Sequence, residues 1–192
     1  MPDLSEHPDR KRWNAKYEAA GEPGFLPHPL AVWALSQDVP EGPVLDLASG
    51  PSGSALRFAA EGHPVTAVDV SEVALDLLRE EAEHRRLADL ITPVQADLSD
   101  WLASTRQRFA IVLCTGFWDA RVFGPAVAAV PSGGLVLWEA FTDRARQRRP
   151  DLPSEWCLGE GEPAALLPAG FRVVLQEELP DQAKRRFAAR SA

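Results

Sequence analysis

The chain alternates short, continuous apolar runs with segments whose apolar residues recur at helical spacing. Four of the runs are typical of strands that are buried on both faces. They are VLDLA (44–48), VTAVDV (65–70), AIVLC (110–114) and GLVLWEAF (134–141). Helix-like segments between them cover 53–61, 72–86 and 120–130. This alternation predicts a mostly parallel sheet with helices on both of its faces.

The two ends of the chain depart from the alternation. Residues 8–20 and 28–38 are predicted helices that precede the first strand. At the other end, strands predicted over 171–177 and 185–190 are separated by about seven residues. That connection is too short for a helical crossover, so the last two strands are predicted to be antiparallel.

Length and charge limit the possible classes of protein. A chain of 192 residues suits one domain with a sizeable core, so we expect a single domain over 1–192. A helical lid segment over 1–40 would precede a Rossmann-like core over 43–192. The formal net charge of −8 argues against a nonspecific nucleic-acid binder.

Cysteine usage and hydropathy predict a cytoplasmic protein without a metal. Cys114 and Cys157 lack metal-ligand spacing, so we expect free thiols in a reducing compartment. The N-terminus shows no apolar signal-peptide region. The sequence contains no stretch near the ~18 apolar residues that a membrane-spanning helix needs, so no membrane association is expected.

The stretch VLDLASGPSGSAL (44–56) joins the first predicted strand to a helix through small residues. Ligands of open parallel sheets bind beyond the carboxyl ends of the strands, where the strand order reverses. Ala48-x-Gly50-x-x-Gly53 fits a degenerate dinucleotide-binding fingerprint. However, Asp46 stands just before the turn, where a carboxylate would repel a pyrophosphate and suit a cationic group. Two cofactor classes therefore remain open at this point.

Acidic residues also end the next two predicted strands. Asp69 follows Asp46 by 23 residues, a position from which a carboxylate can accept both hydroxyls of a ribose. Asp97 follows the third strand, predicted over 91–96, in VQADL. Aspartate often caps strand ends and turns, which is the alternative interpretation for each residue taken singly. Three acids in register favour a ligand site.

Several motifs together resemble the class I S-adenosylmethionine-dependent methyltransferases, and among them the small tellurite-resistance/thiopurine-type enzymes. The motifs are RWNAKY (12–17), VLDLASG, VTAVDVS, VQADL, LCTGFWDARVFG, PSGGLVLWEAF and the tail from Trp156. The resemblance implies an α/β, Rossmann-like doubly wound sheet of about seven strands in the order 3-2-1-4-5-7-6. It also implies methyl transfer to a small-molecule acceptor, such as a thiol, a metalloid oxyanion or a small acid. S-adenosylhomocysteine would be the product, and the protein would be a monomer or homodimer.

Position by position, the resemblance assigns the first strand end to the methionine part of the cofactor. Asp46 and Gly50 would lie by its amino and carboxylate groups. Ala48 occupies the first glycine position of the family motif, and Ser52 occupies the third. Ser52 departs from the family pattern. Either its hydroxyl reaches the methionine carboxylate, or Gly53 makes the close approach instead.

The next strand ends would hold the nucleoside. By resemblance, Asp69 binds the ribose hydroxyls and Val70 packs on the adenine. Asp97 would accept from the adenine amino group, with Leu98 beside the ring.

Further residues would enclose the methyl group. By resemblance, Cys114 and Thr115 line the site near it, while Trp13 and Tyr17 belong to an N-terminal lid.

The loop after the fourth predicted strand is expected to face the methyl acceptor. Phe117 and Trp118 either wall an apolar pocket or pack under the next helix. Arg121 is a candidate partner for an anionic acceptor. Asp119 and His28 are candidate bases by position, although a thiolate or oxyanion acceptor needs no base.

The run DRARQRR (143–149) either attracts an anionic substrate or forms a solvated loop, and Trp156 is a candidate cover for the pocket. Two other functions remain alternatives to methyl transfer. One is an NAD-binding Rossmann-type protein, and the other is a cofactor-binding module without catalysis.

Overall fold

Seven strands form one mixed sheet in the order β3-β2-β1-β4-β5-β7-β6 in the computed structural model, which describes residues 3–21 and 23–192. The strands are β1 (Val44–Leu47), β2 (Val65–Asp69), β3 (Ile91–Gln95), β4 (Ile111–Thr115), β5 (Leu135–Phe141), β6 (Phe171–Leu179) and β7 (Lys184–Ser191). Strands β1 to β5 pair in parallel, whereas β7 is antiparallel to both β5 and β6. The predicted fold class and strand order are confirmed, including the antiparallel end.

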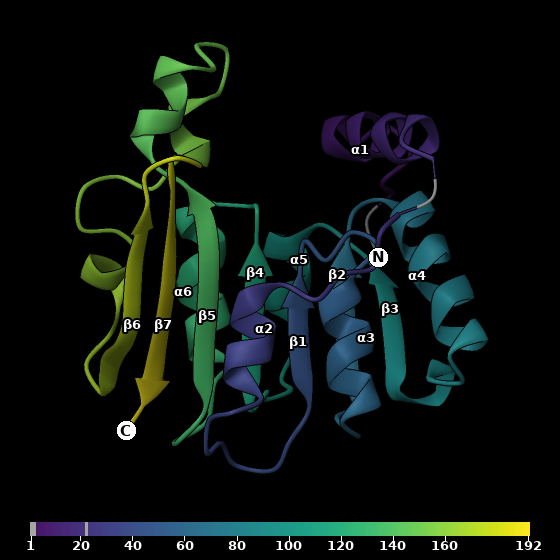
Figure 1. Ribbon diagram of the computed structural model, residues 1–192, viewed down its shortest axis with the longest axis horizontal. Coiled ribbons are helices and arrows are strands. Elements are labelled where there is room, and N and C mark those ends of the chain that lie inside the picture. Colours follow the sequence, from purple (N-terminus) through teal and green to yellow (C-terminus); the bar gives the residue numbers. More distant parts are fainter. Residues whose placement is uncertain (1–2, 22) are drawn as a thin grey trace.

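Helices cover both faces of the sheet (Figure 1). One face carries α2 (Pro29–Ala34), α3 (Gly53–Ala60) and α4 (Glu72–His84), and the other carries α5 (Leu98–Ser104) and α6 (Ala120–Ala128). The strand order reverses between β1 and β4, because α3 follows β1 on one face and α6 follows β4 on the other. The fold therefore has its ligand-binding crevice at the carboxyl ends of these two strands.

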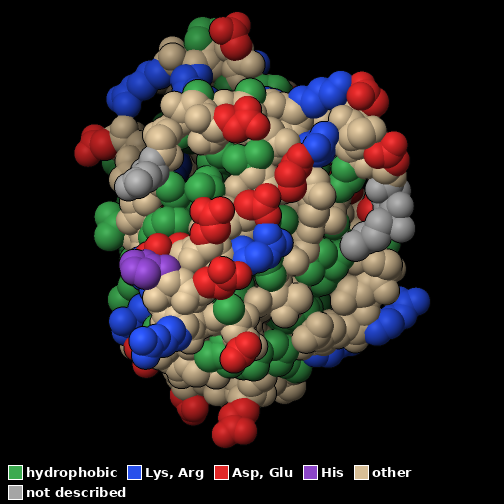
Figure 2. Space-filling view, turned by 90° about the vertical axis from the view of Figure 1, so that its right-hand side faces the viewer, with side chains coloured by type: hydrophobic (Ala, Val, Ile, Leu, Met, Phe, Trp, Pro, Cys, Tyr) green, Lys and Arg blue, Asp and Glu red, His purple; other side chains and the backbone are tan. Residues whose placement is uncertain are grey.

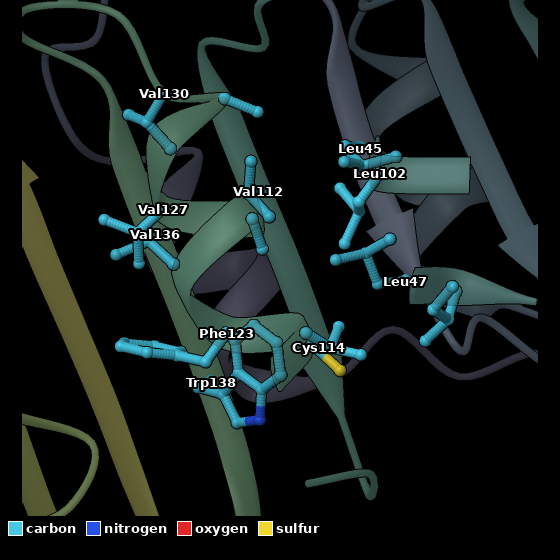
Figure 3. Packing of buried hydrophobic residues seen from close by; sticks show 14 of the residues in the cluster. Leu45, Leu47, Leu102, Val112, Cys114, Phe123, Val127, Val130, Val136 and Trp138 are labelled. Carbon is cyan, nitrogen blue, oxygen red and sulfur yellow. The ribbon is translucent and has the colours of Figure 1, made fainter. Parts of the chain in front are cut away.

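The apolar runs of the strands are buried from both sides. Along β5, Leu135 and Leu137 pack into the core beneath α2 and α3, whereas Val136 and Trp138 pack beneath α6. Figure 3 shows the side chains of α6 between β4 and β5, with Phe123 against Trp138. The two rings are edge to face at 5.2 Å. This packing fixes the ends of β4 and β5, where the loop 116–119 and the segment 143–162 begin.

Two helical segments differ from the sequence expectation. The helix expected over 28–38 ends at Ala34, because Ser36 and Gln37 donate to the carbonyls three residues earlier and tighten the last turn. Helix α5 was not predicted, since its seven residues offer little periodicity.

Two segments rise above the carboxyl edge of the sheet (Figure 1). Helix α1 (Pro8–Ala19) lies on the side of β2 and α4, and the segment 143–162 after β5 lies on the other side. Together they flank the crevice between β1 and β4.

The side of the molecule formed by α4 and β3 faces the viewer in Figure 2. Acidic side chains are scattered over it, and its described residues form no continuous basic stretch. No helix among the described residues has both the length and the hydropathy needed to cross a membrane.

Candidate functional site

The loop after β1 is held in a conformation that brings its backbone under helix α1. Ala48 and Gly50 both lie in the left-handed region, with φ of 49° and 57°. A Cβ atom at Gly50 would stand 2.7 Å from Oη of Tyr17, so this position requires glycine. Ala48 adopts the same region despite its Cβ, which costs about 1–2 kcal/mol. The chain thus keeps the turn that its motif predicts, with strain at Ala48.

Ser52 joins the end of β1 to the start of α3. Its Oγ accepts a hydrogen bond from the Ala55 backbone at 2.9 Å and caps the helix. The same hydroxyl donates to Oδ2 of Asp46 at 2.5 Å. The departure from the family pattern at Ser52 therefore gives the buried carboxylate a donor.

Gly53 accommodates the chain that crosses the start of α3. A Cβ atom there would lie 2.4 Å from the carbonyl carbon of Phe25. The segment 25–28 therefore packs directly on the loop after β1. The backbone N–H of His28 donates to Oγ of Ser54 at 3.0 Å, which fastens the end of this segment.

Asp69 connects the ends of β1 and β2. Its Oδ2 accepts from the Gly50 backbone at 2.8 Å, and its Oδ1 accepts from the Ser71 backbone at 2.8 Å. Burial raises the pKa of this carboxyl, while the backbone donors oppose the shift. Each oxygen retains acceptor capacity for a further donor.

Asp46 is almost fully buried, with 2% of its surface exposed. Burial raises its pKa to about 7, the Ser52 hydrogen bond lowers it, and the nearby charge of Asp69 adds to the rise. No cationic side chain of the described residues pairs with it. A ligand carrying a positive group would supply the missing counter-charge.

Asp97 lies at the start of α5, where its Oδ1 accepts from the backbones of Ser99 and Asp100. Its other oxygen lies 3.5 Å from Nε2 of His7. Next to it is a cavity of about 320 Å³, lined by Leu4, Gln95, Ala96, Asp97, Asp100, Trp101 and Ser104. Leu98 is buried as the first residue of α5, and Val70 accepts a hydrogen bond from Gln95 through its carbonyl.

The end of β4 leads into the loop 116–119, which precedes α6. Cys114 is buried in the core, and burial raises the pKa of its thiol, with further contributions from Asp46 and Asp69. Thr115 follows at the partly exposed strand end. The indole of Trp138 donates to the carbonyl of Phe117 at 2.8 Å and holds the loop in place.

Trp118 is buried, with its ring 5.5 Å from Phe123 and 5.9 Å from Trp138. Most of its surface therefore packs under α6, as one of the two sequence interpretations expected. It also borders a second cavity of about 420 Å³. The other residues around this cavity are Asp119, Ala120, Asp143, Ser154, Glu155, Cys157, Gly159 and Glu162.

The two candidate bases are both engaged in hydrogen bonds. Asp119 caps α6 through the Arg121 backbone and pairs with the Arg121 side chain, which lowers the pKa of the carboxyl. His28 accepts from the Leu30 backbone at Nδ1, and its Nε2 lies 3.1 Å from Glu139. This arrangement fixes the imidazole as the tautomer that carries its proton on Nε2.

Sequence reasoning missed Glu139, which lies inside β5 and is 1% exposed. Lys184 and Arg186 of β7 each donate to it at 2.7 Å, in addition to His28. Although burial alone would raise the pKa of Glu139, these three partners lower it to about 2. The signals were an acid within an otherwise apolar run and the KRR cluster at 184–186.

One face of helix α1 contacts the loop after β1 and the start of α4. Arg10 pairs with Glu72, Asn14 accepts from the Ser71 hydroxyl at 2.7 Å, and Tyr17 lies over Gly50. Burial, and then the charge of Asp69, raise the pKa of the Tyr17 hydroxyl. Trp13 stacks on Tyr17 with ring centroids 5.9 Å apart.

Comparison with known families agrees with this arrangement. Residues 44–130 match the model of a methyltransferase domain, which spans β1 to α6 and the crevice between them. Over these residues the chain is similar to methyltransferase domains. A comparison of the chain with curated protein sequences gives no match.

Solved structures share the fold of this protein across most of the chain. One comes from a study of the conversion of a disulfide bond into a thioacetal group during echinomycin biosynthesis. It has a TM-score of 0.71 and 19% identity, over 95% of this chain and 91% of that one. TehB from Haemophilus influenzae has a TM-score of 0.69 and 18% identity, over 95% and 67% of the two chains. Magnesium protoporphyrin IX methyltransferase from Synechocystis PCC 6803, with bound S-adenosylhomocysteine, has a TM-score of 0.67 and 14% identity, over 85% and 80%.

Two features of the loop after β1 fit S-adenosylmethionine, the cofactor that the sequence resemblance implies. Asp46 is a buried acid without a cationic partner among the described residues, and the cofactor carries a positive amino group. The left-handed turn at Ala48 and Gly50 places backbone at the start of α3, where a carboxylate is favoured. Within 3–21 and 23–192, no three His, Cys, Asp or Glu side chains are grouped as a metal site.

Proposed function

We propose that this protein is an S-adenosylmethionine-dependent methyltransferase that methylates a small-molecule acceptor by in-line displacement, the acceptor being a thiol, a metalloid oxyanion or a small acid. The observation that carries the proposal is the pair of buried acids at the ends of β1 and β2. Asp46 and Asp69 are close enough to raise the pKa of Asp46, and both border the same loop. Such a pair suits a ligand that combines a cationic amino group with ribose hydroxyls.

The proposed binding roles follow the strand ends. Asp46, Ala48, Gly50 and Ser52 would hold the methionine part, with Ser52 acting through Asp46. Asp69 would accept the ribose hydroxyls with its remaining lone pairs.

Val70 and Leu98 would flank the adenine, and Asp97 would accept from its amino group. The cavity beside Asp97 supports this placement of the base.

When bound, S-adenosylmethionine supplies a methyl group that is activated by the adjacent sulfonium. The protein contributes alignment and exclusion of water. Cys114 and Thr115 would border the methyl group. Trp13 and Tyr17 would close over it as a lid, consistent with the contact between Tyr17 and Gly50.

The two candidate bases bear on the ionisation state of the acceptor, because a neutral hydroxyl or amine must lose a proton to a base. His28 and Asp119 have their polar atoms engaged by Leu30, Glu139 and Arg121. The polar side-chain atoms of His28 and Asp119 already take part in these contacts, so neither residue is placed to accept a proton from the substrate. This supports an acceptor that is already ionised, because an anion needs no general base.

We also propose an oligomeric state, a location and the kinds of partner for the enzyme. We expect it to act as a monomer or homodimer in the cytoplasm, without nucleic acid or membrane as a partner. The net charge of −8 supports the expectation for nucleic acid.

Calorimetric titration with S-adenosylhomocysteine and with NAD separates methyl transfer from the NAD-binding alternative. We expect saturable binding of S-adenosylhomocysteine and none of NAD, and the reverse would contradict the proposal. Turnover of S-adenosylmethionine with a panel of thiols, tellurite, selenite and small acids then tests catalysis. Tight cofactor binding without turnover of any acceptor would favour the noncatalytic module.

A further inference from the structure

Cationic and aromatic side chains gather where the two segments above the crevice meet. The guanidinium of Arg12, on α1, lies 4.7 Å from the ring centroid of Trp156. Arg149, at the end of the arginine run, lies 5.1 Å from the ring of Phe141. We call Arg12, Lys16, Arg149, Phe141 and Trp156 the roof cluster. It joins α1 to the segment after β5 across the carboxyl edge of the sheet.

Side chains on one face of helix α1 contact α4 and the loop after β1, and side chains on another face belong to the roof cluster. Asn14 and Tyr17 face α4 and the loop after β1. Arg12 and Lys16 are four residues apart, so they share another stripe of the helix. Helix α1 therefore covers the loop after β1 and places two cations beside that loop.

The positive charge of the roof cluster is not neutralised. Among the described residues, no carboxylate lies within 4.0 Å of Arg12, Lys16 or Arg149. Burial lowers the pKa of Lys16, and the charges of Arg12 and Arg149 lower it further, so the three cations repel one another. A bound anion would relieve this repulsion.

A fourth cation lies next to the roof cluster. Lys184 stands 5.5 Å from the ring of Phe141, on the strand beside β5. Its charge is offset by Glu139, which Arg186 also neutralises. Because Glu139 offsets the charge of Lys184, the preference for an anion rests on Arg12, Lys16 and Arg149.

We propose that the roof cluster binds the carboxylate of the methyl acceptor, and that the acceptor is a small organic acid with an apolar body. The inference rests on the proposed methyl transfer, and it selects one of the three acceptor classes named there. Arg149 and Lys16 would bind the carboxylate, since a guanidinium presents paired donors to two oxygens. Phe141 and Trp156 would contact the apolar body.

Binding of benzoate, benzylamine and benzyl alcohol tests this site, because the three probes share a body and differ in charge. Saturation-transfer NMR titrations would use the full chain, with and without S-adenosylhomocysteine. The variants are Arg149→Gln and Lys16→Gln. Arg144→Gln is the matched control, because Arg144 is an exposed arginine of the same run and contacts neither aromatic ring.

We expect benzoate to bind the wild type at least about tenfold more tightly than benzylamine or benzyl alcohol. In Arg149→Gln and Lys16→Gln its dissociation constant should rise about three- to tenfold, with no change in the control. Equal benzoate affinity in all variants would overturn the proposal. Benzylamine binding as tightly as benzoate would also overturn it, and would point instead to the acidic cavity beside Trp118.

The experiment separates failure of this site from failure of methyl transfer. S-adenosylhomocysteine affinity is measured independently, and Arg149→Gln is expected to retain it, since Arg149 contacts Phe141 and has no contact with the loop after β1, whereas Lys16 stands 4.1 Å from the ring of the proposed lid residue Trp13. Charge-selective benzoate binding without any cofactor binding would support the anion site and contradict methyl transfer. Cofactor binding without benzoate binding would contradict the anion site alone.

Discussion

Replacing Asp46 with asparagine is predicted to stabilise the cofactor-free protein at alkaline pH while weakening the cofactor. The pKa of Asp46 rises from 3.8 to about 7 through burial. Between pH 4 and 7 the folded protein therefore binds a proton that the unfolded chain releases, and stability falls as pH rises through this window. A shift of about three units corresponds to ~4 kcal/mol of lost stability at pH 8.

Asparagine removes the buried charge and keeps an oxygen that can accept from Ser52. Its new N–H₂ group is buried without an assigned acceptor, which costs about 1–3 kcal/mol. The net expectation at pH 8 is a gain of ~1–3 kcal/mol in the free energy of unfolding. At pH 5 the native Asp46 is already protonated, so the substitution should give no gain.

Urea unfolding at pH 5, 6, 7 and 8, followed by the fluorescence of the six tryptophans, measures this difference. Asp89→Asn removes an exposed carboxylate as the control and should change stability by less than about 0.5 kcal/mol at every pH. S-adenosylhomocysteine should bind Asp46→Asn about tenfold more weakly, because the counter-charge for its amino group is lost. A loss of stability that is equal at pH 5 and pH 8 would refute the reasoning.

Three further substitutions test the surrounding contacts. Glu139→Gln should lower stability by ~3 kcal/mol at pH 7, because the low pKa of Glu139 stabilises the fold above its unfolded value of about 4.5. Urea unfolding checks this, and the wild type itself should lose the contribution as pH falls towards 2. Ala48→Gly should raise stability by ~0.5–1 kcal/mol by relieving the left-handed alanine, and a lower melting temperature would count against it. Gly53→Ala should cost ~1–3 kcal/mol, because its Cβ would overlap the Phe25 carbonyl. An unchanged melting temperature would show that the segment 25–28 moves freely.

The fold was predictable because its signals are local and repeated. Each central strand is a continuous apolar run, and acids or small residues mark the carboxyl ends at Asp46 and Asp69. The short link between the last two strands excluded a crossover, which predicted their antiparallel pairing. The strand order itself came from the resemblance to the methyltransferase family.

The contacts around the candidate site were less predictable, because they join residues far apart in the chain. Glu139 meets Lys184 and Arg186 across paired strands, and its third partner, His28, comes from the N-terminal segment. A one-dimensional pattern gives no distance between such residues. The bond from Ser52 to Asp46 spans six positions, yet it depends on the left-handed turn between them.

The sequence allows two interpretations of Asp97, as a ligand contact and as a helix cap. Asp97 was interpreted as an adenine contact, and the structure also makes it the cap of α5. Its role toward adenine stays a prediction.

A crystal structure with S-adenosylhomocysteine would show whether the ends of β1 and β2 hold the cofactor through Asp46 and Asp69. We predict both ribose hydroxyls within hydrogen-bond distance of Asp69, and the amino group on the side of Asp46. A ligand bound elsewhere, or one whose ribose faces away from Asp69, would contradict it.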